Sequence, residues 1–300
     1  MFQGYYYPLN KGKKESATTK NNMKELLKNI LKSIGIYHPL QSFYRGGIGV
    51  VINTYYRVSY AKYQGCGYEC NFCFARYERF VPHYPEKTIE NAITQNDVIA
   101  GFGKNVFCPS CMSKNRERLV LAVLQNKLLV DGKRILHFSP EKHLFKYIST
   151  KASVTTVDIM PGFYQSIDKN ILQEDATNLG FASESFDMII ANHIMEHIPE
   201  DTKAMSEMHR VLKTGSVAIL QIPYSEKLNK TIEEPLISDP ERQEELYGQR
   251  DHVRIYALKD YVARLEGSGF TVNILTPHTL KEFIKHAIQE RECVVLCYKK

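Results

Sequence analysis

One stretch of the chain indicates the fold: Phe186-Asp187-Met188-Ile189-Ile190-Ala191-Asn192-His193. Its centre is apolar without alternation, which is typical of a strand buried on both faces of a parallel sheet. A helix is expected next at Asp201–Leu212, then a turn at Thr214-Gly215 and a strand at Ser216–Ile222. A strand, a helix and a strand in this order predict a parallel α/β unit.

The same alternation begins earlier in the chain. A strand is expected at Arg134–Phe138, a helix at Lys142–Ser149 and a second strand at Val154–Val157. The second strand ends on Asp158, which lies 19 positions beyond Ser139. A nucleotide-binding unit places a carboxylate on the ribose hydroxyls at a spacing of about 20 residues. Asp158 is therefore a candidate ribose ligand, and the alternative is a solvent-facing acid in a turn.

The remaining elements continue the alternating pattern. They are a short strand at Asn170–Gln173, a helix at Leu258–Gly267, a strand at Thr271–Leu275, a helix at Leu280–Ala287 and a strand at Cys293–Tyr298. The last two strands lie close enough in the sequence to pair antiparallel. We therefore predict an α/β fold with a Rossmann-like sheet that is mostly parallel and has an antiparallel last strand.

Four cysteines form two Cys-x-x-Cys pairs ahead of this half. They are Cys70, Cys73, Cys108 and Cys111. Two such pairs can complete a tetrahedral zinc site, and a shell of four thiolates leaves no open position for chemistry. We therefore predict a structural zinc ribbon that holds together the segment from Gly65 to Arg118. The alternative is four unrelated reduced cysteines. Arg116 and Arg118 are expected to be solvated, with contact to an anionic substrate group as the alternative.

Cys66 offers a rival interpretation of the first pair. With Cys70 and Cys73 it forms Cys-x3-Cys-x-aromatic-Cys, a pattern that resembles the radical S-adenosylmethionine enzymes. Three cysteines in those enzymes bind a 4Fe-4S cluster and leave one iron open. The second cysteine pair and the α/β pattern that follow differ from that family and favour the zinc ribbon.

Four further motifs occur in order along the chain. They are Val157-Asp158, Glu174-Asp175-Ala176, the run from Phe186 to Ile198, and Glu207-Met208-His209-Arg210-Val211-Leu212-Lys213-Thr214-Gly215. Together they resemble the class I S-adenosylmethionine-dependent methyltransferases over about Arg134 to Lys300. The second cysteine pair and Leu136-His137-Phe138-Ser139-Pro140-Glu141 resemble a bacterial branch with a metal ribbon before the catalytic domain. Members of that branch commonly accompany surface-polysaccharide synthesis.

The resemblance implies S-adenosylmethionine as the cofactor and assigns its ligands. Asp158 would bind the ribose, Asp175 and the Ala176 amide would hold the adenine edge, and Asn192 would line the methionine end. The family usually has Gly-x-Gly after the first strand, where this chain has Ser139-Pro140-Glu141. Since none of the three is glycine, a positive φ is not expected there. The resemblance implies that the loop still binds, with Ser139, Pro140 and Glu141 as cofactor-binding residues.

A hydroxyl acceptor would also need a base, and histidine titrates in the useful range. The catalytic candidates are His252, Asp251 and His197, with His193 as a further histidine. We favour His252 because Asp251 and Arg254 place charge beside it. These residues lie on a polar stretch that begins at Ser225 and is long enough to cover the mouth of the sheet. Its acidic residues, which include Glu233, predict that the stretch is solvated.

The run His193-Ile194-Met195-Glu196-His197 also matches the His-x-x-Glu-His signature of an inverted zinc peptidase. That chemistry needs a helix with both imidazoles on one face. Because a buried strand runs into His193 and Pro199 follows closely, we expect His193 at a strand end instead.

Positive charge is concentrated near the N-terminus. Residues 1–62 contain ten Lys or Arg and two Glu, although the whole chain carries only +6. Leu26, Leu27, Ile30, Leu31 and Ile34 share one face of an expected helical arm, which either packs on the body or contacts anionic lipid or a partner. No nucleic-acid partner is expected, because the rest of the chain is slightly acidic. The chain lacks a signal peptide and an apolar run of about 20 residues, so a cytoplasmic location is expected.

Three parts are therefore expected along the chain: a basic tail and helical arm at 1–62, a zinc-ribbon-like region at 63–118, and a class I methyltransferase domain at 119–300. The expected function is S-adenosylmethionine-dependent O-methylation of a saccharide or a related small metabolite. One alternative is a non-catalytic metal-ribbon scaffold with a degenerate methyltransferase domain. A radical S-adenosylmethionine enzyme is the other.

Overall fold

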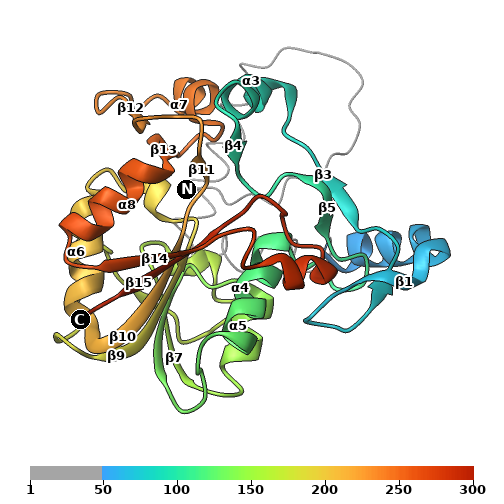
Figure 1. Ribbon diagram of the computed structural model, residues 1–300, viewed down its shortest axis with the longest axis horizontal. Helices are drawn as coiled ribbons and strands as arrows, with labels where there is room; N and C mark the ends of the chain where they lie inside the picture. The colour runs from blue at the N-terminus through green and yellow to red at the C-terminus, as the bar shows by residue number, and fades with distance from the viewer. Residues whose placement is uncertain (1–48) are drawn as a thin grey trace, which may run out of the picture.

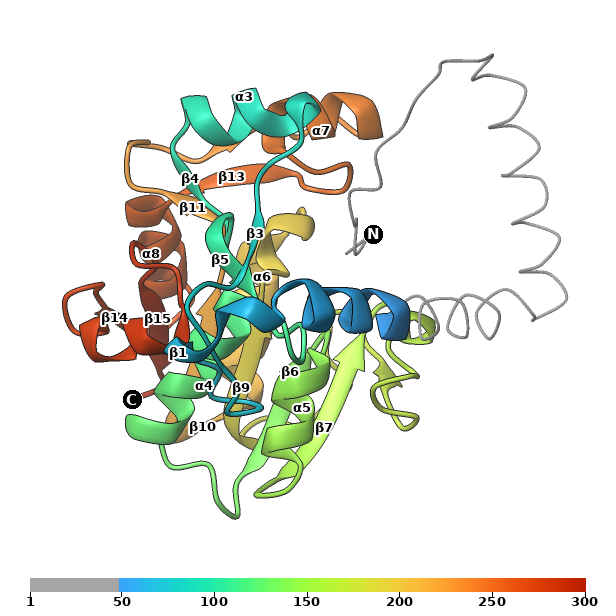
Figure 2. The same ribbon diagram turned by 90° about the vertical axis from the view of Figure 1, so that its right-hand side faces the viewer.

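The structure is a computed structural model that describes residues 49–300. The tail and most of the basic arm, including the helix expected around Leu27–Ile34, lie outside the described residues. A large central sheet with helices on both faces forms the body, a small sheet with two helices covers one end of it, and a cysteine-rich lobe lies at its side (Figures 1 and 2). Within residues 49–300, no helix combines the length and apolar composition needed to cross a bilayer.

The central sheet has seven strands in the order β14-β15-β10-β9-β6-β7-β8. They are β6 (Arg134–Phe138), β7 (Ser153–Asp158), β8 (Leu172–Gln173), β9 (Phe186–Asn192), β10 (Leu212–Gln221), β14 (Thr271–Leu275) and β15 (Val294–Tyr298). Only β15 runs antiparallel to its neighbours, β10 and β14. The predicted mostly parallel sheet with an antiparallel last strand is therefore confirmed. The strand order reverses between β6 and β9, the place where open α/β sheets bind ligands.

Both faces of the sheet are covered by helices. They are α4 (Asn115–Asn126), α5 (Lys142–Ile148), α6 (Asp201–Val211), α8 (Leu258–Gly267) and the short 3₁₀ helix η4 (Lys281–His286). Ile189 of β9 belongs to the same core as α6 and α8, whereas Met188 and Ile190 belong to the core with α4, α5 and η4. Successive side chains of a strand point to opposite faces, so burial of both faces explains why β9 is apolar without alternation.

Two features of this layer differ from the expected elements. The helix expected at Leu280–Ala287 is a 3₁₀ helix over Lys281–His286. Helix α4 was not predicted, and it runs through the boundary expected between residues 118 and 119. Leu119 to Leu124 of α4 are buried in the core of the large sheet. The ribbon-like region and the α/β body are therefore joined by one continuous helix.

The small sheet has the strand order β12-β13-β11-β4. Its strands are β4 (Val98–Ile99), β11 (Tyr224–Ser225), β12 (Ile232–Glu233) and β13 (Arg254–Ala257), and helices α3 (Lys87–Gln95) and α7 (Pro240–Tyr247) lie beside it (Figure 1, top). Helix α7 begins at the Asp239 side chain, which accepts a hydrogen bond from the Arg242 amide, and ends at Gly248 with φ of 85°. The chain between the two cysteine pairs thus contributes α3 and β4 to the layer formed by the polar stretch.

Glu233 in this layer is not solvated as expected. Its carboxylate lies 2.7 Å from Arg254 Nε and 2.6 Å from Arg264 Nη2, and its side chain is 30% exposed. Arg254 also donates hydrogen bonds to the backbone oxygens of Ile198 and Pro199. Arginines from distant segments neutralise this carboxylate, whereas Glu234, Glu241 and Glu245 of the same stretch are exposed as predicted. The hydrogen bonds of Arg254 connect the small sheet to the loop after β9.

The cysteine-rich lobe contains two knuckles with the same backbone geometry. Residues 49–59 are helical, and η1 (Ala61–Tyr63), β1 (Gln64–Glu69), β2 (Arg76–Tyr77), β3 (Val81–His83) and β5 (Gly103–Phe107) follow. In the first knuckle, Phe74 N–H donates to the Cys70 carbonyl, and Cys70 N–H donates to the Ala75 carbonyl. Met112, Cys108 and Ser113 repeat both bonds in the second knuckle. Phe74 and Met112 have φ of 60° and 62°.

Arg118 corrects the expectation of a solvated arginine. Its side chain is fully buried, and it donates hydrogen bonds to backbone carbonyls of both the lobe and the loop that ends η4. The acceptors are Ser113, Asn105, Val106, His286 and Ala287. A guanidinium has five N–H donors and tolerates burial when these are satisfied. Arg118 therefore ties the second knuckle to the α/β body.

Candidate cofactor and acceptor site

The loop after β6 adopts the turn that glycine usually provides. Ser139 has φ of 45°, so the expectation that the missing glycine excludes a positive φ is wrong. Ser139 N–H donates to the Val157 carbonyl at 2.9 Å, and its Oγ donates to Asp158 Oδ2 at 2.6 Å. These bonds to the neighbouring strand compensate for the strain of the left-handed backbone. Ser139 thus takes the backbone conformation that glycine usually provides at the carboxyl end of β6.

Asp158 lies at the end of β7, beside this turn. Its Oδ1 accepts a hydrogen bond from Met160 N–H at 2.7 Å, while Oδ2 accepts the bond from Ser139. A carboxylate has about four acceptor positions, so the two protein bonds orient the group and leave capacity for hydroxyl donors. This arrangement fits the ribose of a nucleoside.

Glu141 and Asn192 come together across the switch point of the sheet. Asn192 Nδ2 donates to Glu141 Oε1 at 3.1 Å, and His137 Nε2 lies 3.0 Å from Glu141 Oε2. Burial tends to raise the pKa of Glu141, but His137 outweighs it and the pKa is lowered. Asn192 Oδ1 is buried and has no hydrogen-bond partner among the described residues. It is therefore an acceptor suited to the ammonium group of an amino-acid ligand.

Asp175 and Ala176 lie beyond β8, at the flank of the site. Asp175 Oδ1 accepts hydrogen bonds from the amide and the hydroxyl of Thr177, both at 2.8 Å, and these bonds lower its pKa. Glu174 N–H donates to the Asp158 carbonyl at 3.2 Å, which holds this turn next to Asp158. All the predicted cofactor-binding residues thus lie along the carboxyl edge of β6, β7, β8 and β9.

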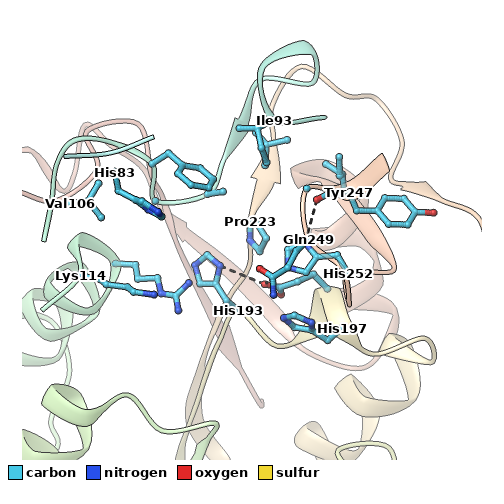
Figure 3. Close-up of a pocket in the computed structure, with 18 of the residues that line it drawn as sticks. His83, Ile93, Val106, Lys114, His193, His197, Pro223, Tyr247, Gln249 and His252 are labelled. Carbon is cyan, nitrogen blue, oxygen red and sulfur yellow. Dashed lines mark hydrogen bonds and ion pairs between the residues drawn. The ribbon is translucent and has the colours of Figure 1, made fainter. Parts of the chain in front are cut away.

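A cavity of about 150 Å³ lies between the end of β9 and the small sheet (Figure 3). Its walls come from β3, the segment from α3 to β5, the start of α4, the loop after β9, Pro223 after β10, and the segment from the end of α7 to β13. The imidazoles that line it are His83, His193, His197 and His252. His193 directly follows Asn192, so the cavity adjoins the predicted methionine end of the cofactor site.

Two of the three predicted catalytic residues, His197 and His252, line this cavity, and the third, Asp251, contacts His197 (Figure 3). His197 Nδ1 lies 3.4 Å from Asp251 Oδ2 and 3.2 Å from the Asp251 carbonyl oxygen. Burial alone would lower the pKa of His197, but Asp251 raises it. The rings of His197 and His252 pack edge to face with centroids 4.7 Å apart. Burial and the charge of His197 lower the pKa of His252 to about 4.

Glu196 belongs to the same wall, although the sequence indicated it only as part of the His-x-x-Glu-His motif. It is 1% exposed, and its Oε1 lies 3.6 Å from His193 Nδ1 and 4.0 Å from His252 Nε2. Burial raises its pKa, but the imidazoles outweigh this and lower it to about 2. Glu196 and His197 lie on one 3₁₀ turn, η3 (Met195–His197), after the strand end at His193. The long helix that an inverted zinc peptidase requires is therefore missing from this described segment.

Comparison with known proteins identifies the fold family. Residues 141–220 match the family model described as a methyltransferase domain. The match covers residues 141–220 and supports a class I S-adenosylmethionine-dependent methyltransferase domain in this part of the chain. Methyltransferase domains of this family use S-adenosylmethionine as their cofactor. No curated protein sequence matches the chain.

Several solved structures are similar to this chain at low identity. An S-adenosylmethionine dependent methyltransferase from Mesorhizobium loti is 14% identical, with 60% of this chain and 97% of that chain covered and a TM-score of 0.42. The YcgJ protein from Bacillus subtilis is 15% identical, with 61% and 98% covered and a TM-score of 0.42. The carbon methyltransferase CurJ is 14% identical, with 61% and 52% covered and a TM-score of 0.40.

Arg116, at the start of α4, is a charged group of the cavity wall without an ion-pair partner among the described residues. It lines the cavity, its Nε is buried without a hydrogen-bond acceptor, and no described carboxylate lies within ion-pair distance of its guanidinium. Its charge nevertheless acts on the buried Glu141 and His193. Burial and Arg116 lower the pKa of Lys114 to about 8. The only sequence signal for these two residues was their position after the second cysteine pair.

Proposed function

We propose that this chain transfers a methyl group from S-adenosylmethionine to a hydroxyl of a saccharide or a related small metabolite held in the cavity. The observation that carries the proposal is the continuity of the two sites at the end of β9. Asn192 belongs to the cofactor edge, and the next residue, His193, lines the cavity. An acceptor in the cavity would therefore meet the methyl group without solvent between them.

S-adenosylmethionine supplies an electrophilic methyl group on a sulfonium. The protein has to align the acceptor with that methyl group and exclude water. Asp158, fixed by Ser139, would hold the ribose hydroxyls, and Asn192 Oδ1 would accept from the ammonium group. Incubation with S-adenosylmethionine and a panel of sugars, sugar acids and sugar phosphates tests the proposal by mass spectrometry. An acceptor heavier by one methyl group supports it, whereas the absence of S-adenosylhomocysteine formation with every acceptor argues against it.

Arg116 would pair with the carboxylate of the cofactor's methionine end. Replacing Arg116 by alanine should lower the affinity for S-adenosylhomocysteine by about 10-fold to 100-fold, because a hydrogen bond to a charged group contributes about 1.5–3 kcal/mol. The affinity for 5′-methylthioadenosine, which lacks the carboxylate, should stay unchanged. Calorimetry with both ligands makes the comparison. If the variant and the unmodified protein bind S-adenosylhomocysteine equally well, Arg116 does not pair with the cofactor carboxylate. It would then pair with an anionic group of the acceptor.

The wall formed by His197, Asp251 and His252 would activate the acceptor hydroxyl. Replacing His252 by alanine should lower turnover by about 100-fold or more while the affinity for S-adenosylhomocysteine is kept. His209 provides the control, because its ring packs against Phe270 away from the cavity. His209→Gln should keep both turnover and affinity. Unchanged turnover in His252→Ala would show that this wall does not activate the acceptor hydroxyl.

The four paired cysteines would hold a structural zinc ion. Cys70 Sγ lies 3.7 Å from Cys111 Sγ, and Cys73 Sγ lies 3.7 Å from Cys108 Sγ. Ideal tetrahedral geometry with Zn–S bonds of about 2.3 Å requires sulfur–sulfur distances of about 3.8 Å. Cys66 is exposed and does not belong to the convergent group of four. This arrangement supports zinc over the iron–sulfur cluster of a radical enzyme, which would need Cys66.

A non-catalytic scaffold is the rival from another class. It predicts that the altered loop after β6 has lost the cofactor. The positive φ of Ser139 and its bond to Asp158 favour a loop that still binds. Calorimetry separates the two proposals, because a scaffold would give no heat with S-adenosylhomocysteine at millimolar concentration.

A further inference from the structure

We propose that Glu196, His197 and His252 bind a divalent transition-metal ion at the wall of the acceptor cavity. One potential ligand atom from each residue lies within 4.8 Å of the other two. Two imidazoles and one carboxylate form a ligand set that leaves coordination positions open for substrate. The inference rests on the proposed function, because the ion would bind the acceptor hydroxyl in the cavity described above.

Both imidazoles are oriented for metal binding by oxygen atoms behind them. His252 Nδ1 lies 3.3 Å from the Tyr247 carbonyl oxygen, and His197 Nδ1 faces both the carboxylate and the carbonyl of Asp251. In a neutral imidazole these acceptors place the proton on Nδ1 and the lone pair on Nε2. Metal-binding histidines almost always have this kind of acceptor on the second nitrogen. The Nε2 lone pairs of His197 and His252 are therefore available to a metal ion.

The carboxylate of Glu196 provides the negative charge that such an ion requires. It is 1% exposed, and its Oε2 has no hydrogen-bond partner among the described residues. His252 Nε2 lies 4.0 Å from Oε1, too far for a hydrogen bond. A buried carboxylate that faces lone pairs is costly unless a cation lies between them. A bound divalent ion would satisfy all three groups.

The ligand types distinguish this site from the cysteine group. Nitrogen and oxygen ligands suit Mn²⁺, Fe²⁺, Co²⁺ and Zn²⁺, whereas four thiolates select Zn²⁺. Mn²⁺ is therefore a probe that should bind at the cavity and leave the cysteine site undisturbed. The same reasoning disfavours Ca²⁺ and Mg²⁺, which prefer sites built from oxygen atoms alone.

The ion would act as a Lewis acid on the acceptor hydroxyl. The oxygen–hydrogen bond of the acceptor breaks, and the proton goes to solvent water at the cavity. A bond then forms between that oxygen and the methyl carbon, while the carbon–sulfur bond breaks and sulfur keeps its electron pair. No oxidant or reductant is needed. His197 and His252 would thus support the reaction as ligands, with Asp251 and the Tyr247 carbonyl as positioning groups.

Titration with Mn²⁺, followed by the electron paramagnetic resonance signal of the free ion, tests this inference. The unmodified chain should bind one Mn²⁺, and Glu196→Gln should weaken that binding by about tenfold or more, since it replaces a charged ligand by a neutral one of the same size. His209→Gln should bind like the unmodified chain. Removing the ion with a chelator should lower methyl transfer, and Mn²⁺ should restore it.

Titration of the same samples with S-adenosylhomocysteine separates this inference from the proposed function. Binding of S-adenosylhomocysteine without binding of Mn²⁺ would overturn the metal site and leave the methyltransferase function standing. If the unmodified chain does not bind S-adenosylhomocysteine, the proposed methyltransferase function itself is refuted. If Glu196→Gln fails to fold, His252→Gln gives the same comparison from another ligand. Mn²⁺ affinity equal to that of the unmodified chain in a folded variant would also overturn the site.

Discussion

Replacing Cys108 by serine should remove the zinc ion and unfold the cysteine-rich lobe. Cys108 is fully buried in a small core with Tyr77 and Phe80, and such a core supplies little hydrophobic stabilisation. Zinc binding by comparable four-ligand peptides is worth about 10–16 kcal/mol and is coupled to folding. We therefore expect zinc content near zero and rapid proteolysis between residues 64 and 113. Metal analysis by mass spectrometry and limited proteolysis measure both effects.

Cys66 provides the matched control for this experiment. It is an exposed cysteine of the same lobe and stands outside the convergent group. Cys66→Ser should keep both the zinc and the protease resistance. Equal zinc content in Cys108→Ser and the unmodified chain would contradict a four-thiolate site. Iron with sulfide, lost on replacement of Cys66, would support the radical enzyme instead.

Replacing Asp158 by alanine should lower the affinity for S-adenosylhomocysteine by about 100-fold or more. The ribose hydroxyls would lose two hydrogen bonds to the carboxylate, and hydrogen bonds to charged groups contribute about 1.5–3 kcal/mol each. The substitution also removes the acceptor for Ser139 Oγ and Met160 N–H, which hold the turn after β6. Calorimetry measures the affinity, and the thermal midpoint shows whether the fold persists.

Asp168 allows the specific effect to be separated from a general loss of charge. It lies in the loop after the same strand, where it accepts hydrogen bonds from Thr156 Oγ1 and Asn170 N–H. Asp168→Asn removes one negative charge and keeps the shape of the side chain. The affinity for S-adenosylhomocysteine should remain within about threefold, a difference of less than 1 kcal/mol. An Asp158→Ala variant that binds as tightly as Asp168→Asn would remove Asp158 from the cofactor site.

The strands of the large sheet were predictable because their patterns are local. Strands β6 and β14 and helix α8 have the bounds expected from the sequence. The small sheet was not predicted, since three of its strands contain two residues each and pair with segments far away in the chain. Ile99 pairs with Tyr224, for example, and no periodicity within two residues indicates that contact. Tertiary pairing alone defines this layer.

The site shows the same division between local and distant causes. Asp158 was predictable from its spacing after the first strand. The positive φ of Ser139 was not, because it depends on bonds to residues of the neighbouring strand. The burial of Arg118 depends in the same way on carbonyls of His286 and Ala287, which lie far away in the sequence. Glu196 is part of the His-x-x-Glu-His motif, but its proposed role follows only from the fold, which places it beside His252 on one wall of the cavity.

The central claim is that S-adenosylmethionine lies at the carboxyl ends of β6, β7 and β9, with its ribose on Asp158. A crystal soaked with S-adenosylhomocysteine tests this directly. We predict electron density for the bound ligand, with both ribose hydroxyls within about 3 Å of the Asp158 carboxylate and the ammonium group near Asn192 Oδ1. An empty cleft beside a well-ordered Ser139-Pro140-Glu141 loop, at millimolar ligand, would contradict it.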